Sequence, residues 1–343
     1  MKHRFQNIIR FLVSFGLLGL LGYLFRHQLG ASISTLQEAD WRFLLLAGLI
    51  YLLFILISAW RWQVLLQAQR LYFTTWYLAR VFTLGLFFCK LLPTSIGGDV
   101  MRIAYTTRPG MGPQAFSATL LDRLLGFQSL TFLAIIMGAV ISLRQASALS
   151  LGAGRFTGFG VVLLLSAILL LLVAVTLLFF NDRVYLSVHH LLNSLGRKFA
   201  ALVRLSGLVE RTYQAVKNYR HQPWALVISF LSGIGVQAAL SLAWFFTARA
   251  VGAGVPPVYY FIFIPVLNIV VNIPAIGGLG VREAAFVLFF TPPWLPNRLS
   301  PEQALSTALL FLALDLFFAL IGGVLFAFMK RTPQSIKEGK KEE

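Results

Sequence analysis

Long stretches of apolar residues dominate the pattern of this chain. Six of them have roughly the 20 residues that a helix needs to cross the hydrocarbon core of a bilayer. They occur at residues 8–25, 41–60, 118–142, 156–180, 224–248 and 303–329. The pattern therefore predicts an all-α fold, a polytopic membrane helix bundle with six full spans. We interpret the first stretch as an uncleaved span, because no small-residue cleavage site follows it directly.

Two further apolar stretches, residues 76–92 and 257–273, run into proline and glycine before they complete a span. The breaks read LPTSIGGD at 92–99 and IPAIGGLG at 273–280, and both continue to an arginine in the pattern I-G-G-x-x-x-R. One such break alone is typical of a simple kink. A matched pair in oppositely oriented segments points to a substrate site at a repeat interface. We therefore predict two inverted, broken or re-entrant helical hairpins.

The distribution of basic residues decides the predicted topology, once four membrane-embedded ones (Arg80, Lys90, Arg123, Arg282) are left out. If eight segments simply alternate, 13 basic residues fall on one side and 12 on the other. If the two broken segments turn back, the counts become 19 and 6. Cytoplasmic loops carry the excess of Lys and Arg. The second scheme therefore predicts that both the N-terminus and the C-terminus are cytoplasmic.

The only sizeable polar stretch between the predicted spans covers residues 181–222. Its apolar residues recur at three-to-four-residue steps, which predicts an amphipathic helical element. Two positions for this element stay open, either in the cytoplasmic interface of the membrane or packed on the cytoplasmic ends of the bundle. Residues 331–343 mix charges and are predicted to be a disordered tail. We expect residues 1–343 to form a single membrane domain.

Composition supports this class and excludes others. Of 343 residues, 58% are hydrophobic and only 12% are charged, with a mean hydropathy of +0.79. A soluble fold cannot hide that much apolar surface. The net charge of +17 fits cytoplasmic flanks and anionic lipid headgroups, so we expect no nucleic-acid partner. With one cysteine, Cys89, and no metal or nucleotide motif, we expect no metal and no cofactor.

Several charged residues fall where the pattern predicts hydrocarbon, and these are the candidate site residues. Near the centre of a bilayer each charge costs at least roughly 2.5 to 3.5 kcal/mol, so it is paired, hydrated or functional. We expect a central network in which acidic residues form ion pairs with arginines from other helices. A purely structural ion network is the alternative. The candidates are Asp99, Arg102, Asp122, Arg123, Arg282, Glu283 and Asp315.

The two Gly-Gly turns add a second reason to expect an anion site. A helix that begins just after such a turn directs unpaired N–H groups and its positive dipole end toward the middle of the membrane. Guanidinium groups one turn later bind phosphate bidentately. The hypothesis is that Arg102, Arg123 and Arg282 hold the anion, that acids orient them, and that Asp315 is a candidate for proton uptake. The glycines concerned are Gly97, Gly98, Gly277, Gly278 and Gly280.

Three motifs, LPTSIGGDVMR at 92–102, LLDRLLG at 120–126 and IPAIGGLGVREAA at 273–285, resemble those of the lysylphosphatidylglycerol synthase transmembrane region, a flippase-like family. The resemblance covers residues 8–330. It implies a multi-pass protein of the cell inner membrane whose relatives move lipids between leaflets. In two-domain relatives a soluble aminoacyltransferase domain makes the lipid, and we expect no such domain here. The resemblance extends to stand-alone members associated with hopanoid or glycan-carrier lipids.

Three functions follow from these expectations. The first is translocation of a polar or anionic phospholipid through the central charged site, without enzymatic activity. The second is a membrane-embedded transferase acting on lipid-linked substrates. The third is a non-catalytic partner subunit of a lipid-modifying enzyme or glycosyltransferase. The expected partners are membrane lipids of anionic, glycan-linked or hopanoid type.

Overall fold

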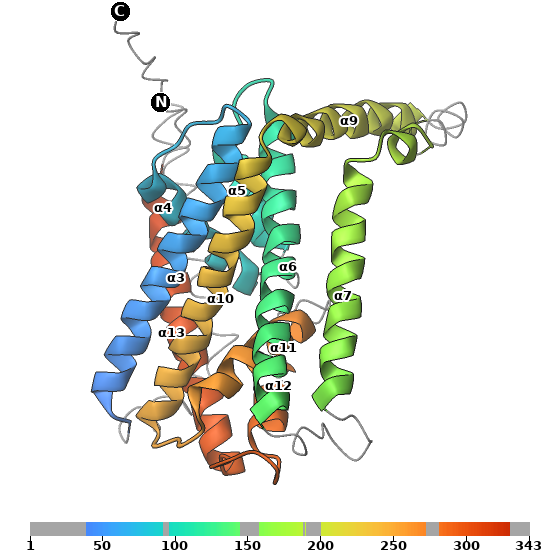
Figure 1. Ribbon diagram of the computed structural model, residues 1–343. Helices are drawn as coiled ribbons and strands as arrows, with labels where there is room; N and C mark the ends of the chain where they lie inside the picture. The colour runs from blue at the N-terminus through green and yellow to red at the C-terminus, as the bar shows by residue number, and fades with distance from the viewer. Residues whose placement is uncertain are drawn as a thin grey trace, which may run out of the picture.

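The computed structural model describes residues 39–91, 96–144, 158–187, 189, 200–271 and 281–329. The regular elements within these ranges are all helical, and Figure 1 shows them as a bundle of long, roughly parallel helices. They are α3 (Trp41–Ala68), α4 (Thr75–Leu91), α5 (Ile96–Thr106), α6 (Gly112–Arg144), α7 (Gly158–Phe179), α9 (Ala200–Lys217), the 3-10 helix η1 (Asn218–His221), α10 (Pro223–Ala250), α11 (Pro257–Val271), α12 (Val281–Phe290) and α13 (Pro301–Phe328).

Five of these helices are long and apolar enough to cross a membrane, namely α3, α6, α7, α10 and α13. They correspond to five of the six predicted spans, which confirms the polytopic helical bundle. The remaining predicted span, residues 8–25, lies outside the described residues, as does the tail at 331–343. The structure extends one span: α3 continues past residue 60 to Ala68, because Trp62, Leu65 and Leu66 are fully buried there.

The two broken segments form helical hairpins at opposite ends of the bundle. Helices α4 and α5 pack against each other in the half of the molecule that carries α9, and α11 and α12 do so in the other half (Figure 1). The contact within the first hairpin is close, since a Cβ added to Gly98 would lie 2.7 Å from the backbone oxygen of Gly85. Only a residue without a side chain fits there. Because the two hairpins lie at opposite ends of the bundle, the predicted inversion of the two hairpins is present.

Helix α9 is the longest described part of the predicted 181–222 element. It lies across the end of the bundle, from α6 toward α7, at a steep angle to the spanning helices (Figure 1). Tyr213 and Val216 are buried while Glu210 and Arg211 are exposed, so the helix is amphipathic. It packs against the end of α6, and both positions considered for this element stay open. Its cytoplasmic side stays a prediction.

A polar cluster around Asp182 ties α9 to the end of α7. The Tyr213 hydroxyl donates to Asp182, and Lys217 and Arg220 lie 3.0 and 3.2 Å from its carboxylate oxygens. The Tyr213 ring also stacks on that of Tyr185, with 4.0 Å between centroids. These bonds keep the pKa of Asp182 well below its usual range, with the Tyr213 hydrogen bond as the main cause. Burial and the same bond raise the pKa of Tyr213 to about 12.

This cluster predicts an alkaline transition. Because the pKa of Tyr213 is raised to about 12 by folding, its contribution to stability is complete below the ordinary tyrosine pKa of about 10. That contribution is lost as the pH rises from there through the raised value. We expect limited proteolysis between α7 and α9 to accelerate over this pH range. In Tyr213→Phe, cleavage should be faster already at neutral pH and should lose this alkaline step. An unchanged alkaline step in that variant would assign it to another group.

Candidate functional site

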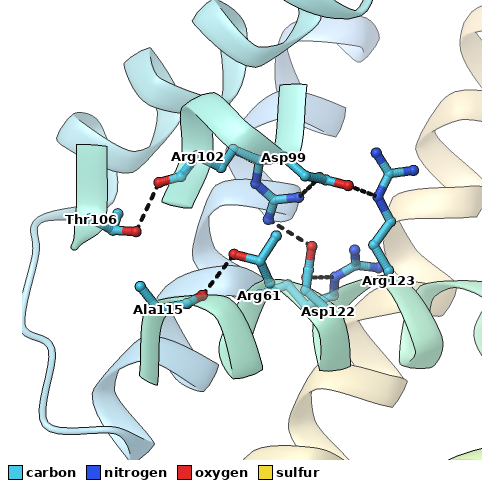
Figure 2. Close-up of polar contacts among 8 residues, drawn as sticks. Arg61, Asp99, Arg102, Thr106, Ala115, Asp122 and Arg123 are labelled. Carbon is cyan, nitrogen blue, oxygen red and sulfur yellow. Dashed lines mark hydrogen bonds and ion pairs between the residues drawn. The ribbon is translucent and has the colours of Figure 1, made fainter. Parts of the chain in front are cut away.

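The first of two ion networks within the described residues is centred on Asp122, in the first third of α6. Its Oδ1 accepts from Arg61 Nε at 2.8 Å and its Oδ2 from Arg102 Nη2 at 2.7 Å. Asp99 extends the network, accepting from Arg123 Nε at 2.7 Å and lying 3.5 Å from Arg102 Nη1. Figure 2 shows the two carboxylates between the three guanidinium groups. In this part of the described structure, three arginines therefore face two aspartates.

The bundle is shaped around the guanidinium of Arg61. A Cβ added to Gly126 on α6 or to Gly233 on α10 would lie 3.2 or 3.3 Å from Arg61 Nη1. The two glycines therefore make the room in which this side chain lies between α6 and α10. Arg102 is held by an aromatic ring. Its Cζ lies 4.2 Å from the centre of the Trp62 ring, a favourable cation–π position.

Arg61 is a site residue that sequence reasoning missed. The basic count places Arg61 on the cytoplasmic side, because Arg61 is not among the four residues left out of it, yet its side chain is only 9% exposed and is paired with Asp122. The signal was that apolar residues continue on both sides of it, from Trp60 through Trp62. Arg102, also counted there, is buried too. Without these two arginines the basic count is still 17 against 6, so the count still predicts the same topology.

The second network is centred on Asp315 in α13 and joins the two hairpins. Its Oδ2 accepts from Lys90 Nζ, at the end of α4, at 2.6 Å and from Arg282 Nη1, at the start of α12, at 2.7 Å. The Tyr51 hydroxyl donates to Oδ1 at 2.7 Å. Glu283 adds a second acid, 3.6 Å from Arg282 Nε. Two cations and two acids balance here, and one carboxylate holds both hairpin tips.

The candidate residues are thus divided between two networks. Arg102 and Arg123 lie with Asp99 and Asp122, whereas Arg282 lies with Asp315 and Glu283. The three arginines expected to hold one anion do not converge on a single acid. The reason is where the residues lie in the fold: Arg102 and Arg123 are on the adjacent helices α5 and α6, whereas Arg282 begins α12 of the other hairpin and meets α13. Lys90, left out of the basic count as membrane-embedded, pairs with Asp315 inside the bundle.

The structure describes the glycines of the first motif but not those of the second. Gly97 and Gly98 are buried in the first turn of α5, whereas Gly277, Gly278 and Gly280 lie outside the described residues. Asp99 occupies the first turn of α5 and Glu283 that of α12. A carboxylate of the same helix therefore already meets the positive end of each helix dipole. The arginines, rather than the helix ends, supply the positive field of this site.

A cavity of about 300 Å³ opens beside the first network. Arg61, Arg102 and Arg123 line its charged part, together with Asp99 and Asp122. The wall also includes residues of both hairpins, Gly85 and Gly98 from α4 and α5 and Asn268 from α11. Its apolar part is formed by Phe54, Phe82, Leu86, Phe127, Leu130, Val236 and Leu240. A polar group can therefore reach the arginines while an attached hydrocarbon stays in apolar surroundings.

Two polar atoms at this cavity have no hydrogen-bond partner among the described residues, Ser58 Oγ and Arg102 Nε. Both side chains line the cavity, and Ser58 is 1% exposed and Arg102 5% exposed. Buried donors without partners are rare, and each calls for an explanation such as a bound ligand or water. Over the same described ranges, no group of three or more His, Cys, Asp or Glu is placed to hold a metal ion.

Five apolar membrane-crossing helices, two inverted half-length hairpins and buried ion pairs define an integral, polytopic helical membrane protein. A family model described as "Lysylphosphatidylglycerol synthase TM region" matches residues 7–323. The chain belongs to this family and is thus a membrane protein related to lipid metabolism. No curated protein and no solved structure matches it.

Proposed function

We propose that this protein translocates a polar or anionic lipid between the leaflets of the membrane and does so without covalent chemistry. The observation that carries the proposal is the cavity of about 300 Å³, which is bordered by both hairpins and by three arginines against two aspartates. The headgroup occupies this charged cavity, and the acyl chains stay in hydrocarbon.

In this proposal, the conformational change begins at Asp315, whose carboxylate binds both hairpins. Lys90 of the first hairpin and Arg282 of the second both bind its Oδ2, so the hairpin tips are held together in this conformation. Release of one cation would free one hairpin and open the cavity toward one leaflet, as inverted repeats do in alternating access. Because Asp315 then loses a positive neighbour, it is the candidate for proton uptake if transport is coupled.

The test is leaflet-to-leaflet transfer of labelled lipid in liposomes that contain the purified protein. We expect faster transfer than in empty liposomes, with the lipid chemically unchanged. Product formation would instead support a transferase that acts on lipid-linked substrates. If neither occurs, the chain is a partner subunit of a lipid-modifying enzyme or glycosyltransferase.

The proposed location is the cell inner membrane, with both termini and α9 in the cytoplasm. Glu210 on α9 and Arg298 between α12 and α13 are both exposed. Helix α9 and the connection from α12 to α13 lie at opposite ends of the bundle (Figure 1). In a Cys89→Ala background, we expect an impermeant maleimide to label Arg298→Cys in intact cells and Glu210→Cys only after the membrane is permeabilised. The reverse pattern would invert the topology.

A further inference from the structure

A second cavity, of about 450 Å³, lies outside both ion networks. It is formed where the end of α3 and the start of α6 meet η1, at the end of the bundle that carries α9 (Figure 1). Its volume is in the range of about 300 to 1,000 Å³ that is usual for small-molecule sites. Its lining contains four side-chain amides, one arginine and one histidine, and only two apolar residues, Ala68 and Met111. The wall of this cavity is therefore polar, unlike that of the central cavity.

Two buried amide oxygens of this wall lack a hydrogen-bond donor. They are Oε1 of Gln69, a residue that is 3% exposed, and Oε1 of Gln114, and neither has a partner among the described residues. Gln69 Nε2 donates to the Ala215 carbonyl of α9 at 2.7 Å, which fixes the orientation of this amide. The Tyr219 hydroxyl is engaged elsewhere, since it donates to the Leu65 carbonyl at 2.8 Å. Buried acceptors without partners call for a bound group, and that group must be a donor such as a hydroxyl.

Arg70, on the same wall, occupies a backbone position that normally takes glycine. Its φ is 59°, in the left-handed region. Its N–H bonds to the Gln67 carbonyl and the next N–H to the Leu66 carbonyl, both at 2.9 Å. This is the Schellman arrangement that ends many helices, and its left-handed residue is usually glycine. An arginine adopts that conformation less readily, because it has a Cβ. What the arginine adds is a guanidinium on the cavity wall.

The cavity combines these oxygens with groups that bind anions. Arg70 and His221 are both exposed, so the cavity is reached from water. A guanidinium binds phosphate bidentately, and an imidazole N–H is a further donor. The described residues of the lining include no carboxylate that would repel an anion. Because only two apolar residues line the wall, it offers no surface for an acyl chain.

We propose that this cavity binds a small, water-soluble anion that carries hydroxyl groups, of the sugar phosphate type. Arg70 and His221 bind the phosphate, and the hydroxyl groups donate to the Oε1 atoms of Gln69 and Gln114. The site shares no lining residue with the central cavity. The proposal does not depend on lipid translocation, because the ligand enters from water, at the end of the bundle that the basic count predicts to be cytoplasmic.

Isothermal titration calorimetry of the purified protein in detergent tests this proposal, with glucose 6-phosphate, inorganic phosphate and glucose as ligands. We expect glucose 6-phosphate to bind about tenfold more tightly than either of the others, because it alone engages both the arginine and the glutamine oxygens. Equal binding of glucose 6-phosphate and inorganic phosphate, or no binding of either, overturns the proposal. Phosphatidylinositol in mixed micelles presents similar groups on a lipid. It should not displace glucose 6-phosphate, and displacement would overturn the assignment to a water-soluble ligand.

A substitution at Arg70 locates the binding. Arg70→Gly removes the guanidinium and places the favoured residue at the left-handed position. We therefore expect about tenfold weaker binding of glucose 6-phosphate, together with a thermal unfolding midpoint equal to or above that of the wild type. Arg211, exposed on α9 at the same end of the bundle, does not line the cavity. The matched control Arg211→Gln should leave binding unchanged. If Arg70→Gly binds as tightly as this control, the cavity is not the site and the proposal falls.

Substitutions at Gln114 test the charge of the ligand. Gln114→Glu keeps the shape of the side chain and replaces the amide by a carboxylate, so binding of glucose 6-phosphate should fall about tenfold through repulsion of like charges. Gln114→Leu removes the oxygen without adding charge. It should weaken glucose 6-phosphate and leave inorganic phosphate unchanged. Tighter binding in Gln114→Glu, or equal weakening of both ligands in Gln114→Leu, would contradict the assigned roles and overturn the proposal.

Discussion

Replacing Asp315 by asparagine should cost about 3 to 5 kcal/mol of stability, the usual penalty for removing one partner of a buried charge pair, and should abolish lipid transfer. The side chain keeps its size and its contact to Tyr51 but loses its charge. Lys90 Nζ and Arg282 Nη1, 2.6 and 2.7 Å from the same oxygen, would then face each other without an anion between them. The midpoint of thermal unfolding, followed by tryptophan fluorescence, measures the loss.

A matched control lies on the same helix. Glu302 is exposed in the first turn of α13, so Glu302→Gln removes the same charge without breaking a buried pair. We expect its unfolding midpoint to stay close to that of the wild type. Adding Lys90→Met to Asp315→Asn should recover part of the stability, because Arg282 keeps Glu283 as a partner. An Asp315→Asn protein as stable as Glu302→Gln would show that this carboxylate does not hold the hairpins together.

Gly98→Ala should destabilise the first hairpin and stop lipid transfer. The added Cβ would lie 2.7 Å from the Gly85 oxygen and 2.5 Å from Cys89 Sγ, and a backbone oxygen cannot move aside as a flexible side chain does. Overpacking of this kind costs typically about 1 to 3 kcal/mol. The shift would also separate α5, which carries Asp99 and Arg102, from α4. Thermal unfolding and leaflet transfer in liposomes are the two measurements.

The same substitution at Gly235 on α10 provides the control, since a Cβ there meets nothing within 4 Å. Alanine is a better helix former than glycine by roughly 0.8 to 1.0 kcal/mol, so Gly235→Ala should hold or raise stability. Opposite signs for the two variants are expected. If Gly98→Ala behaves like Gly235→Ala, the close approach of α4 and α5 does not limit this hairpin.

The sequence predicted the elements of the fold well, because a membrane-spanning helix needs only an unbroken run of apolar residues, which is visible in the local sequence. Five predicted spans and the interrupted hairpins correspond to helices of the structure. It also identified charged residues that become buried, because a charge in an apolar run stands out. It was wrong about Arg61 for a related reason. The predicted span ended at residue 60, and the arginine just beyond it was assigned to the cytoplasmic flank.

By itself the sequence determined that this is a polytopic membrane protein with two inverted hairpins and several charges in hydrocarbon. Only the tertiary structure decided which charges meet. Arg61 and Asp122 are 61 residues apart, and Lys90 and Asp315 are 225 apart. Such pairings depend on how each helix is rotated and how closely it packs, as at Gly126 and Gly233. Those quantities arise from contacts between distant segments, so the charged wall of the cavity forms only when the helices are assembled.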